Sequence, residues 1–256
     1  MLDRAKHLYR TSVMAVDGAV GRVDEVLYDD SSWAIRYLVV DTGHRLPGRK
    51  VLVPPRAFEP MTEGGPIVVR WTRQFIQDSP SVDFEDGAPL SRERECALNM
   101  HYDLVCSRAT ASQADSGIPA GALDGPPANP QRMMPPAASA GWPMPQGALR
   151  RASAFNGYAI HATDGPVGRV TDILFDNDAW VIRHVVVGTR RGWLRGASVL
   201  IGVHWIERVD WARQAVDVSI TTAQVRSSPA YDGRSPVHRD YEVRLHSAYD
   251  RTGYRD

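Results

Sequence analysis

One sequence pattern occurs twice in this chain, and this internal repeat constrains the fold more than any other feature. The segment DGAVGRV at residues 17–23 returns as DGPVGRV at residues 164–170, a shift of 147 positions. The same register from Asp17 to Thr42 contains 14 identities in 26 positions. Shorter matches then continue to the tyrosines Tyr102 and Tyr249. We interpret the chain as a tandem duplication of a unit of about 100 residues, which is an ordinary domain size.

The segment between the two copies has a different composition. Residues 108–149 are crowded with Pro, Ala, Gly and Ser. Such a stretch has too little apolar surface to offset the entropy of ordering, so we expect a flexible linker. The predicted organisation is therefore a first domain at residues 1–107, a linker at 108–149 and a second domain at 150–256.

Both copies carry the residue pattern of short β-strands. In each copy, runs rich in β-branched and aromatic residues alternate with turn-forming Asp, Asn, Ser and Gly. The predicted strands are residues 20–28, 33–40, 50–53 and 67–71, and their counterparts at 167–175, 180–187, 198–201 and 216–220. Strands at this spacing indicate a mainly β fold of two small antiparallel barrels. Helical endings are predicted from residues 91 and 237.

The strand sequences resemble a known family. The strings GRVDEVLYD at residues 21–29, WAIRYLVVDTG at 33–43 and GRKVLVP at 48–54 are similar to the PRC-barrel domain. The ending PLSRERE at residues 89–95 is typical of its free-standing bacterial members. The resemblance covers both copies and implies a small β-barrel with a trailing helix. In this family the domain forms the cytoplasmic part of the photosynthetic reaction-centre H subunit and part of a ribosome maturation factor, as an adaptor surface and not a catalyst.

Charge and composition exclude several classes of protein. The chain has 30 Lys and Arg against 30 Asp and Glu, so it lacks the basic surplus of a nucleic-acid binder. Neither a signal peptide nor an apolar run of bilayer length is visible, so we expect no membrane insertion. Its two cysteines, Cys96 and Cys106, do not form a disulfide framework, and we expect reduced thiols and a cytoplasmic location.

The zero net charge conceals a difference between the two copies. Residues 1–107 hold 13 Lys and Arg against 16 Asp and Glu, whereas residues 150–256 hold 15 against 12. Related domains often pack as a pseudo-dimer, and opposite net charge favours pairing one copy with the other. We therefore expect intramolecular contact between the two domains, in a form that opens at high salt. The alternative is two independent domains.

Acidic residues cluster at the predicted hairpins, where two readings compete. They are Asp24, Glu25, Asp29 and Asp30 in the first copy and Asp172, Asp176 and Asp178 in the second. They indicate either a divalent-cation site or ordinary turn formation, and the lack of EF-hand spacing favours turns. The sequence also lacks nucleophile, metal-ligand and phosphate-loop motifs. We therefore predict no catalytic residues, no metal and no cofactor.

Tryptophans and loop residues give the remaining candidates. Trp33 and Trp180 occupy the same strand position in the two copies and are predicted to anchor the barrel core. The glycine-bounded loops at residues 42–48 and 189–196 combine apolar residues with arginines, as partner-binding loops do. The candidate partner contacts are Arg45, Leu46, Trp193, Leu194 and Arg195. Alternatively, the two leucines fold back and close the ends of the barrels.

These observations predict a non-catalytic interaction or scaffold protein that binds another protein. Two alternatives stay open. One is an accessory or assembly protein of photosynthetic or respiratory electron-transfer complexes, which rests only on the H-subunit resemblance. The other is a cation-dependent sensor or an enzyme that uses the Asp-rich turns.

Overall fold

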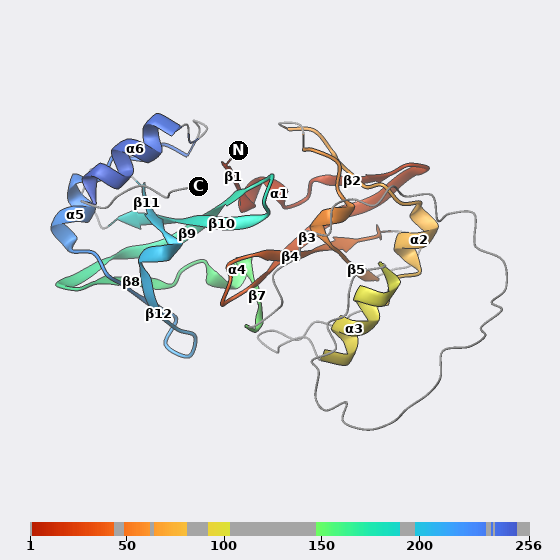
Figure 1. The fold of residues 1–256 in the computed structure, drawn as a ribbon, viewed down its shortest axis with the longest axis horizontal. Helices are drawn as coiled ribbons and strands as arrows, with labels where there is room; N and C mark the ends of the chain where they lie inside the picture. Colours follow the sequence, from red (N-terminus) through yellow and green to blue (C-terminus); the bar gives the residue numbers. More distant parts are fainter. Residues whose placement is uncertain are drawn as a thin grey trace, which may run out of the picture.

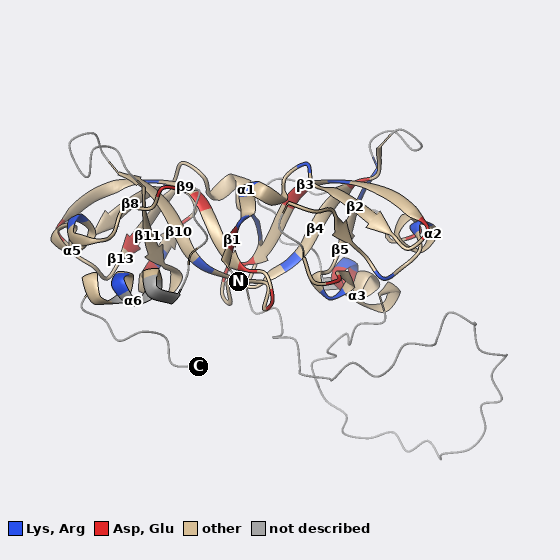
Figure 2. Ribbon diagram, turned by 90° about the horizontal axis from the view of Figure 1, so that it is seen from above, with Lys and Arg blue, Asp and Glu red and all other residues tan. Residues whose placement is uncertain are grey.

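A computed structural model of the chain shows a mainly β protein with one lobe for each copy of the repeat (Figure 1). It describes residues 2–43, 49–61, 64–80, 92–102, 147–189, 198–233, 237 and 239–249. The two lobes form an elongated molecule, and the N-terminal elements β1 and α1 lie between them (Figure 2). Below, "first half" means the described residues up to 102 and "second half" those from 147 onward.

The sheet of the first half has the strand order β5-β4-β3-β2-β6, and β7 pairs with β3 outside this path. Its strands are β2 (Ser12–Ala15), β3 (Gly18–Asp29), β4 (Ile35–Asp41), β5 (Lys50–Val53), β6 (Ile67–Val68) and β7 (Leu149–Arg151). All of these pairings are antiparallel except that of β2 with β6. The helices are α1 (Ala5–Leu8), η2 (Pro55–Ala57), α2 (Arg73–Gln77) and α3 (Arg92–His101).

The sheet of the second half follows the same plan, with the order β11-β10-β9-β8-β13-β12 and with β1 on β9. Its strands are β1 (Leu2–Arg4), β8 (Ala159–Ala162), β9 (Gly165–Asp176), β10 (Val181–Thr189), β11 (Ser198–Gly202), β12 (Ile206–Asp210) and β13 (Ala215–Val218). The helices are α4 (Ala152–Phe155), η4 (Val203–Trp205), α5 (Thr222–Ser227) and α6 (Arg239–Ala248). Each element of this half except β12 therefore has a counterpart at a similar place among the described residues of the first half.

Two repeated glycines allow the long strands β3 and β9 to lie close to the backbone of the neighbouring strands β4 and β10. A Cβ at Gly21 would lie 2.0 Å from the carbonyl oxygen of Asp41, and one at Gly168 would lie 2.1 Å from that of Gly188. Side chains at these positions would collide with backbone, so only glycine fits. Both glycines lie within strands, Gly21 in β3 and Gly168 in β9.

The trailing helices are fixed to their sheets by a repeated tyrosine. The hydroxyl of Tyr102 donates to the carbonyl oxygen of Leu52 at 2.7 Å, and that of Tyr249 donates to the carbonyl oxygen of Leu200 at 2.9 Å. Burial raises the pKa of both tyrosines, to about 12 for Tyr249. Both hydroxyls therefore stay protonated at neutral pH and hold the helix against the sheet.

One hydrophobic core runs through both halves. Its members include Tyr28 and Leu38 of the first half together with Phe155 and Ile182 of the second. A smaller cluster under α3 contains Leu27 and Tyr102 of the first half together with Leu149 of the exchanged strand β7. The two halves therefore share buried apolar surface, which is the main stabilising contribution to a fold.

The expected mainly β class and the predicted strands are present, with different ends. Residues 33–40 were expected as a strand, but β4 begins at Ile35, and the strand expected at 67–71 shortens to β6. In each sheet the pairings among described residues form an open path, so closure into barrels stays a prediction. Residues 103–146, most of the expected linker, lie outside the described residues.

The expectation of reduced thiols is wrong for Cys96, which is disulfide-bonded in the structure. Because disulfides persist in oxidising compartments, this cysteine gives no support to the expected cytoplasmic location. None of the helices among the described residues is both long and apolar enough to cross a bilayer.

Candidate interaction site at the junction of the two halves

The two halves exchange their first strands. β1, from the start of the chain, pairs with β9 in the second half, and Leu2 lies opposite Asp176. β7, at the equivalent place in the second copy, pairs with β3 in the first half, and Leu149 lies opposite Asp29. Each sheet is thus completed by a strand of the other half (Figure 1). We call the region formed by β1, β7 and residues 28–35 and 175–182 the junction.

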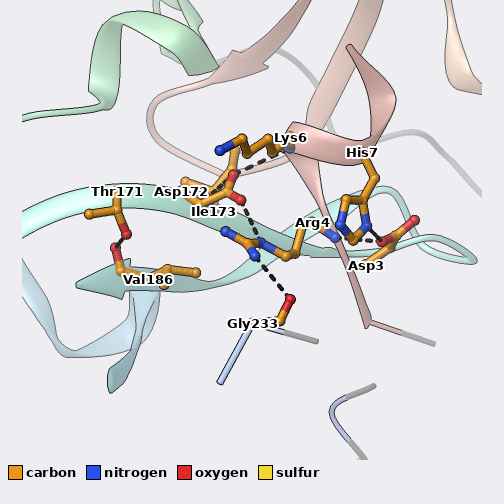
Figure 3. Close-up of polar contacts among 9 residues, drawn as sticks. All are labelled: Asp3, Arg4, Lys6, His7, Thr171, Asp172, Ile173, Val186 and Gly233. Carbon is orange, nitrogen blue, oxygen red and sulfur yellow. Dashed lines mark hydrogen bonds and ion pairs between the residues drawn. The ribbon is translucent and has the colours of Figure 1, made fainter. Parts of the chain in front are cut away.

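A buried carboxylate of the second half accepts hydrogen bonds from the strand β1 and from the helix α1 that follows it. Asp172 on β9 is only 3 % exposed, and its Oδ2 accepts a hydrogen bond from Arg4 Nε at 2.6 Å. Its Oδ1 accepts from the backbone N–H of Lys6 at 3.3 Å, in the first turn of α1 (Figure 3). The guanidinium of Arg4 also donates to the carbonyl oxygen of Gly233 at 3.0 Å. A carboxylate here satisfies both a cation and an otherwise unpaired N–H group of the helix start.

The equivalent carboxylate of the first half is Glu25 on β3, which accepts hydrogen bonds from the helix α4. Its Oε1 accepts from the backbone N–H of Ser153 at 3.3 Å, and its Oε2 accepts from the Ser153 hydroxyl. Oε1 also accepts from the hydroxyl of Tyr9 at 2.9 Å. Burial, together with the charge of Glu25, raises the pKa of Tyr9 well above its ordinary value, so this phenol is a permanent donor. Both carboxylates are therefore occupied as structural acceptors, which argues against acid–base chemistry by either.

Two tryptophans with left-handed backbone bring the strands of the two halves together at the junction. Trp33 has φ 59° and Trp180 has φ 54°, a conformation that is rare for bulky side chains. The carbonyl oxygen of Trp180 accepts from Ile35 N–H at 2.7 Å, and that of Trp33 accepts from Ile182 N–H at 2.8 Å. These two reciprocal bonds relate equivalent residues, as the two sides of a twofold interface do. Backbone strain at both tryptophans thus coincides with the contact between the halves.

The tryptophan rings pack across the same contact. Trp33 stacks on Tyr28 at a centroid distance of 5.5 Å and meets Phe155 of the second half edge-on at 5.8 Å. Trp180 stacks on Phe175 at 5.4 Å and lies 5.1 Å from Phe58 of the first half. The tryptophans were expected to anchor the core of each barrel. They are packed, as expected, but they anchor the junction between the halves.

One edge of the junction has an additional ionic contact. Arg150 on β7 donates through Nε to Asp30 Oδ2 at 2.9 Å, and its guanidinium carbon lies 4.1 Å from the ring centre of Trp211. Asp30 also accepts from the backbone N–H of Ala148 at 2.8 Å. The equivalent positions on the other edge are Asp3 and Asn177. This edge therefore has an ion pair that the sequence of the other edge does not permit.

The acidic turns are held by their own side chains. Asp29 Oδ1 accepts from the backbone N–H groups and hydroxyls of Ser31 and Ser32 at 2.6–3.1 Å, and its Oδ2 accepts from Gly147 N–H at 3.2 Å. Although burial opposes the shift, these hydrogen bonds lower the pKa of Asp29. Asp176 accepts from the N–H groups of Asp178 and Ala179. These contacts support turn formation, and no group of three His, Cys, Asp or Glu among the described residues is arranged to hold a metal.

The contact between the halves was expected to depend on opposite net charge, but its physical basis is different. Strand pairing, the shared core and the tryptophan packing make up most of it. The ion pairs that join the halves include Arg4–Asp172 and Arg150–Asp30. Salt screens exposed charges and leaves apolar burial intact, so we no longer expect the halves to separate at high salt.

The predicted partner contacts Arg45, Leu46, Trp193, Leu194 and Arg195 lie in residues 44–48 and 190–197, outside the described residues. Their role in partner binding stays a prediction. One cavity of about 340 Å³ lies between α6 and the segment before it, lined by Tyr231, Asp232, Tyr241 and Arg244 among others.

Sequence reasoning missed the exchanged strands, although a signal was available. Leu2, Arg4 and Ala5 match Leu149, Arg151 and Ala152 in the same register as the rest of the repeat. This match extends the repeat upstream of the predicted first strand and indicates a further shared element. A three-residue strand carries no information about which sheet it joins, so the exchange itself was not predictable.

Comparison with known proteins adds no relative to this picture. No protein-family model matches the chain, and no curated protein sequence matches it. The resemblance to the PRC-barrel domain therefore stays a prediction from the residues quoted for it.

Proposed function

We propose that this protein is a non-catalytic scaffold built from two PRC-type barrels, which binds another protein through the loops at residues 42–48 and 189–196. The observation that carries the proposal is the junction itself. Exchanged strands and a shared hydrophobic core join the halves into one body. The two buried carboxylates of the junction, Glu25 and Asp172, accept hydrogen bonds from the elements that cross it, which favours a structural role for them. A fixed pair of similar lobes is what a bivalent scaffold requires.

The direction of the strands supports the loops as the contact points. β4 begins beside Trp33 at the junction and ends at Asp41, and β10 runs in the same way from Trp180 to Thr189. A strand of seven residues spans about 20 Å, so each strand leads away from the junction before the chain reaches the loop. Arg45 and Leu46 follow one strand, and Trp193 to Arg195 follow the other.

The test compares loop variants of the immobilised full-length chain. Proteins retained from a bacterial lysate are identified by mass spectrometry for the natural chain and for a variant with Ala at Arg45, Leu46, Trp193, Leu194 and Arg195. The control variant carries Val16→Ala and Arg213→Ala, which removes an exposed apolar residue and an exposed arginine elsewhere. Retention that the loop variant loses and the control keeps supports the proposal. A partner that all three retain equally contradicts it.

The same experiment, with one addition, addresses the alternatives. Recovery of membrane-complex subunits in the loop-dependent set would favour the electron-transfer reading. Calorimetric titration with calcium, magnesium and zinc tests the cation reading, and we expect no binding that Asp29→Asn removes, because Asp29 is occupied by Ser31 and Ser32. The cytoplasmic location stays a prediction.

A further inference from the structure

We infer that the junction surface of each half fits a second unit of the same repeat, so that the partner of a half need not be the other half of its own chain. The inference concerns the junction and is independent of the loop contacts proposed above. It rests on the reciprocity of the contacts. Each half contributes a first strand and also accepts one, so each half contains both sides of its own interface.

The contacts at the centre of the junction are compatible with like pairs. Ala34 and Val181, which are equivalent residues, face each other in an antiparallel bridge. The bonds from Ile35 to Trp180 and from Ile182 to Trp33 use backbone groups that both halves possess. Arg4 and Arg151 occupy equivalent positions in the exchanged strands. Glu25 and Asp172 occupy equivalent positions in the sheets that these strands join. A pair of two first halves or of two second halves would keep all of these groups.

The edges of the junction discriminate between the possible pairs. In the natural pair one edge joins Arg150 to Asp30, and the other has Asp3 and Asn177. Two second halves would place Arg150 near Asn177 at both edges, which a guanidinium and an amide tolerate. Two first halves would place Asp3 near Asp30 at both edges, where like charges repel. The predicted order of stability is therefore the natural pair, then two second halves, then two first halves.

Tandem chains test this order with the linker kept. One chain joins two copies of residues 147–256 through residues 108–146, a second joins two copies of residues 1–107 in the same way, and the natural chain is the reference. Pairing is read from hydrogen exchange of the peptide that contains Ile182 or Ile35, because these amides donate across the junction. We expect full protection and a cooperative melt in the chain of two second halves, and a lower melting temperature with partial protection in the chain of two first halves.

Two substitutions make the test specific to the edges. Asp3→Arg in both copies gives the first half the residue that the second half has at Arg150, and we expect it to raise the melting temperature of the chain of two first halves by about 5 °C. Asp78→Arg, an equal charge change at the exposed end of α2, is the control and should leave that temperature unchanged. An unprotected Ile182 peptide in the chain of two second halves, or equal effects of the two substitutions, would overturn the inference.

Discussion

The two edges of the junction each attach an exchanged strand to the sheet of the other half, but with different side-chain contacts. On one edge β7 meets β3, and Arg150 connects Asp30 to the ring of Trp211. On the other edge β1 meets β9, Arg4 is held between Asp172 and the carbonyl of Gly233, and no counterpart of the Arg150 pair is possible. What the edges share is the strand exchange and the buried carboxylate. The comparison teaches that the exchange is the common structural element and that the outer ion pairs are variations on it.

The largest expected difference between equivalent positions lies at the tryptophans. Trp180 is 7 % exposed and packs between Phe175 and Phe58, so Trp180→Ala should cost about 3–5 kcal/mol of unfolding free energy. Trp33 is partly exposed, and we expect Trp33→Ala to cost about 2–3 kcal/mol. Urea unfolding of both variants measures the two losses. A loss below about 0.5 kcal/mol at either position would remove that ring from the junction.

Removing the buried carboxylates should produce the next largest effect. Asp172→Ala leaves Arg4 and the start of α1 without their acceptor and should cost about 3 kcal/mol. Glu25→Ala removes the acceptor of Ser153 and Tyr9 and should cost about 2 kcal/mol. Asp24→Ala is the control, because its exposed pair with Lys50 is worth less than about 0.5 kcal/mol. If all three variants unfold at the same urea concentration, the carboxylates do not support the exchange.

Exchanging the residues of the two acidic turns should destabilise the protein at both edges, by smaller amounts. Asp30→Asn removes the partner of Arg150 and should cost about 1 kcal/mol, a loss that shrinks at high salt. Asn177→Asp places a second carboxylate near Asp3 and should also destabilise, by about 0.5 kcal/mol, again less at high salt. Thermal melts at low and high salt measure both. Stabilisation by Asn177→Asp would show that the two edges are not equivalent in geometry.

The acidic turns should make the stability depend on pH. Hydrogen bonds lower the pKa of Asp29 and that of Asp176, although burial opposes both shifts. A carboxyl with a lowered pKa in the folded state contributes stability above its unfolded pKa of about 3.9 and loses it as the pH falls through the folded value. Unfolding free energies measured from pH 6 downward should therefore fall in acid, less steeply in Asp29→Asn and in Asp176→Asn than in the natural chain. An acid slope that neither substitution changes would contradict this assignment.

The sequence predicted the strands of each half better than their assembly. β5 has the predicted bounds, and the hairpins around residues 29–32 and 176–179 follow from turn chemistry that acts within a few residues. The exchange of β1 and β7 depends on contacts between residues about 120–174 positions apart, such as Arg4 with Asp172, which no local pattern encodes. For the same reason the tryptophans were identified as packed residues, whereas their place between the halves was not.

The central claim is that the halves are joined by reciprocal backbone bonds and not by net charge. Residue-resolved hydrogen exchange of the full-length chain at low and high salt measures this directly. We predict that the amides of Ile35 and Ile182 are protected as strongly as those of the central strands at both salt concentrations, because Trp180 and Trp33 accept them within a packed junction. Fast exchange of these two amides at either salt concentration, with the central strands still protected, would contradict the account.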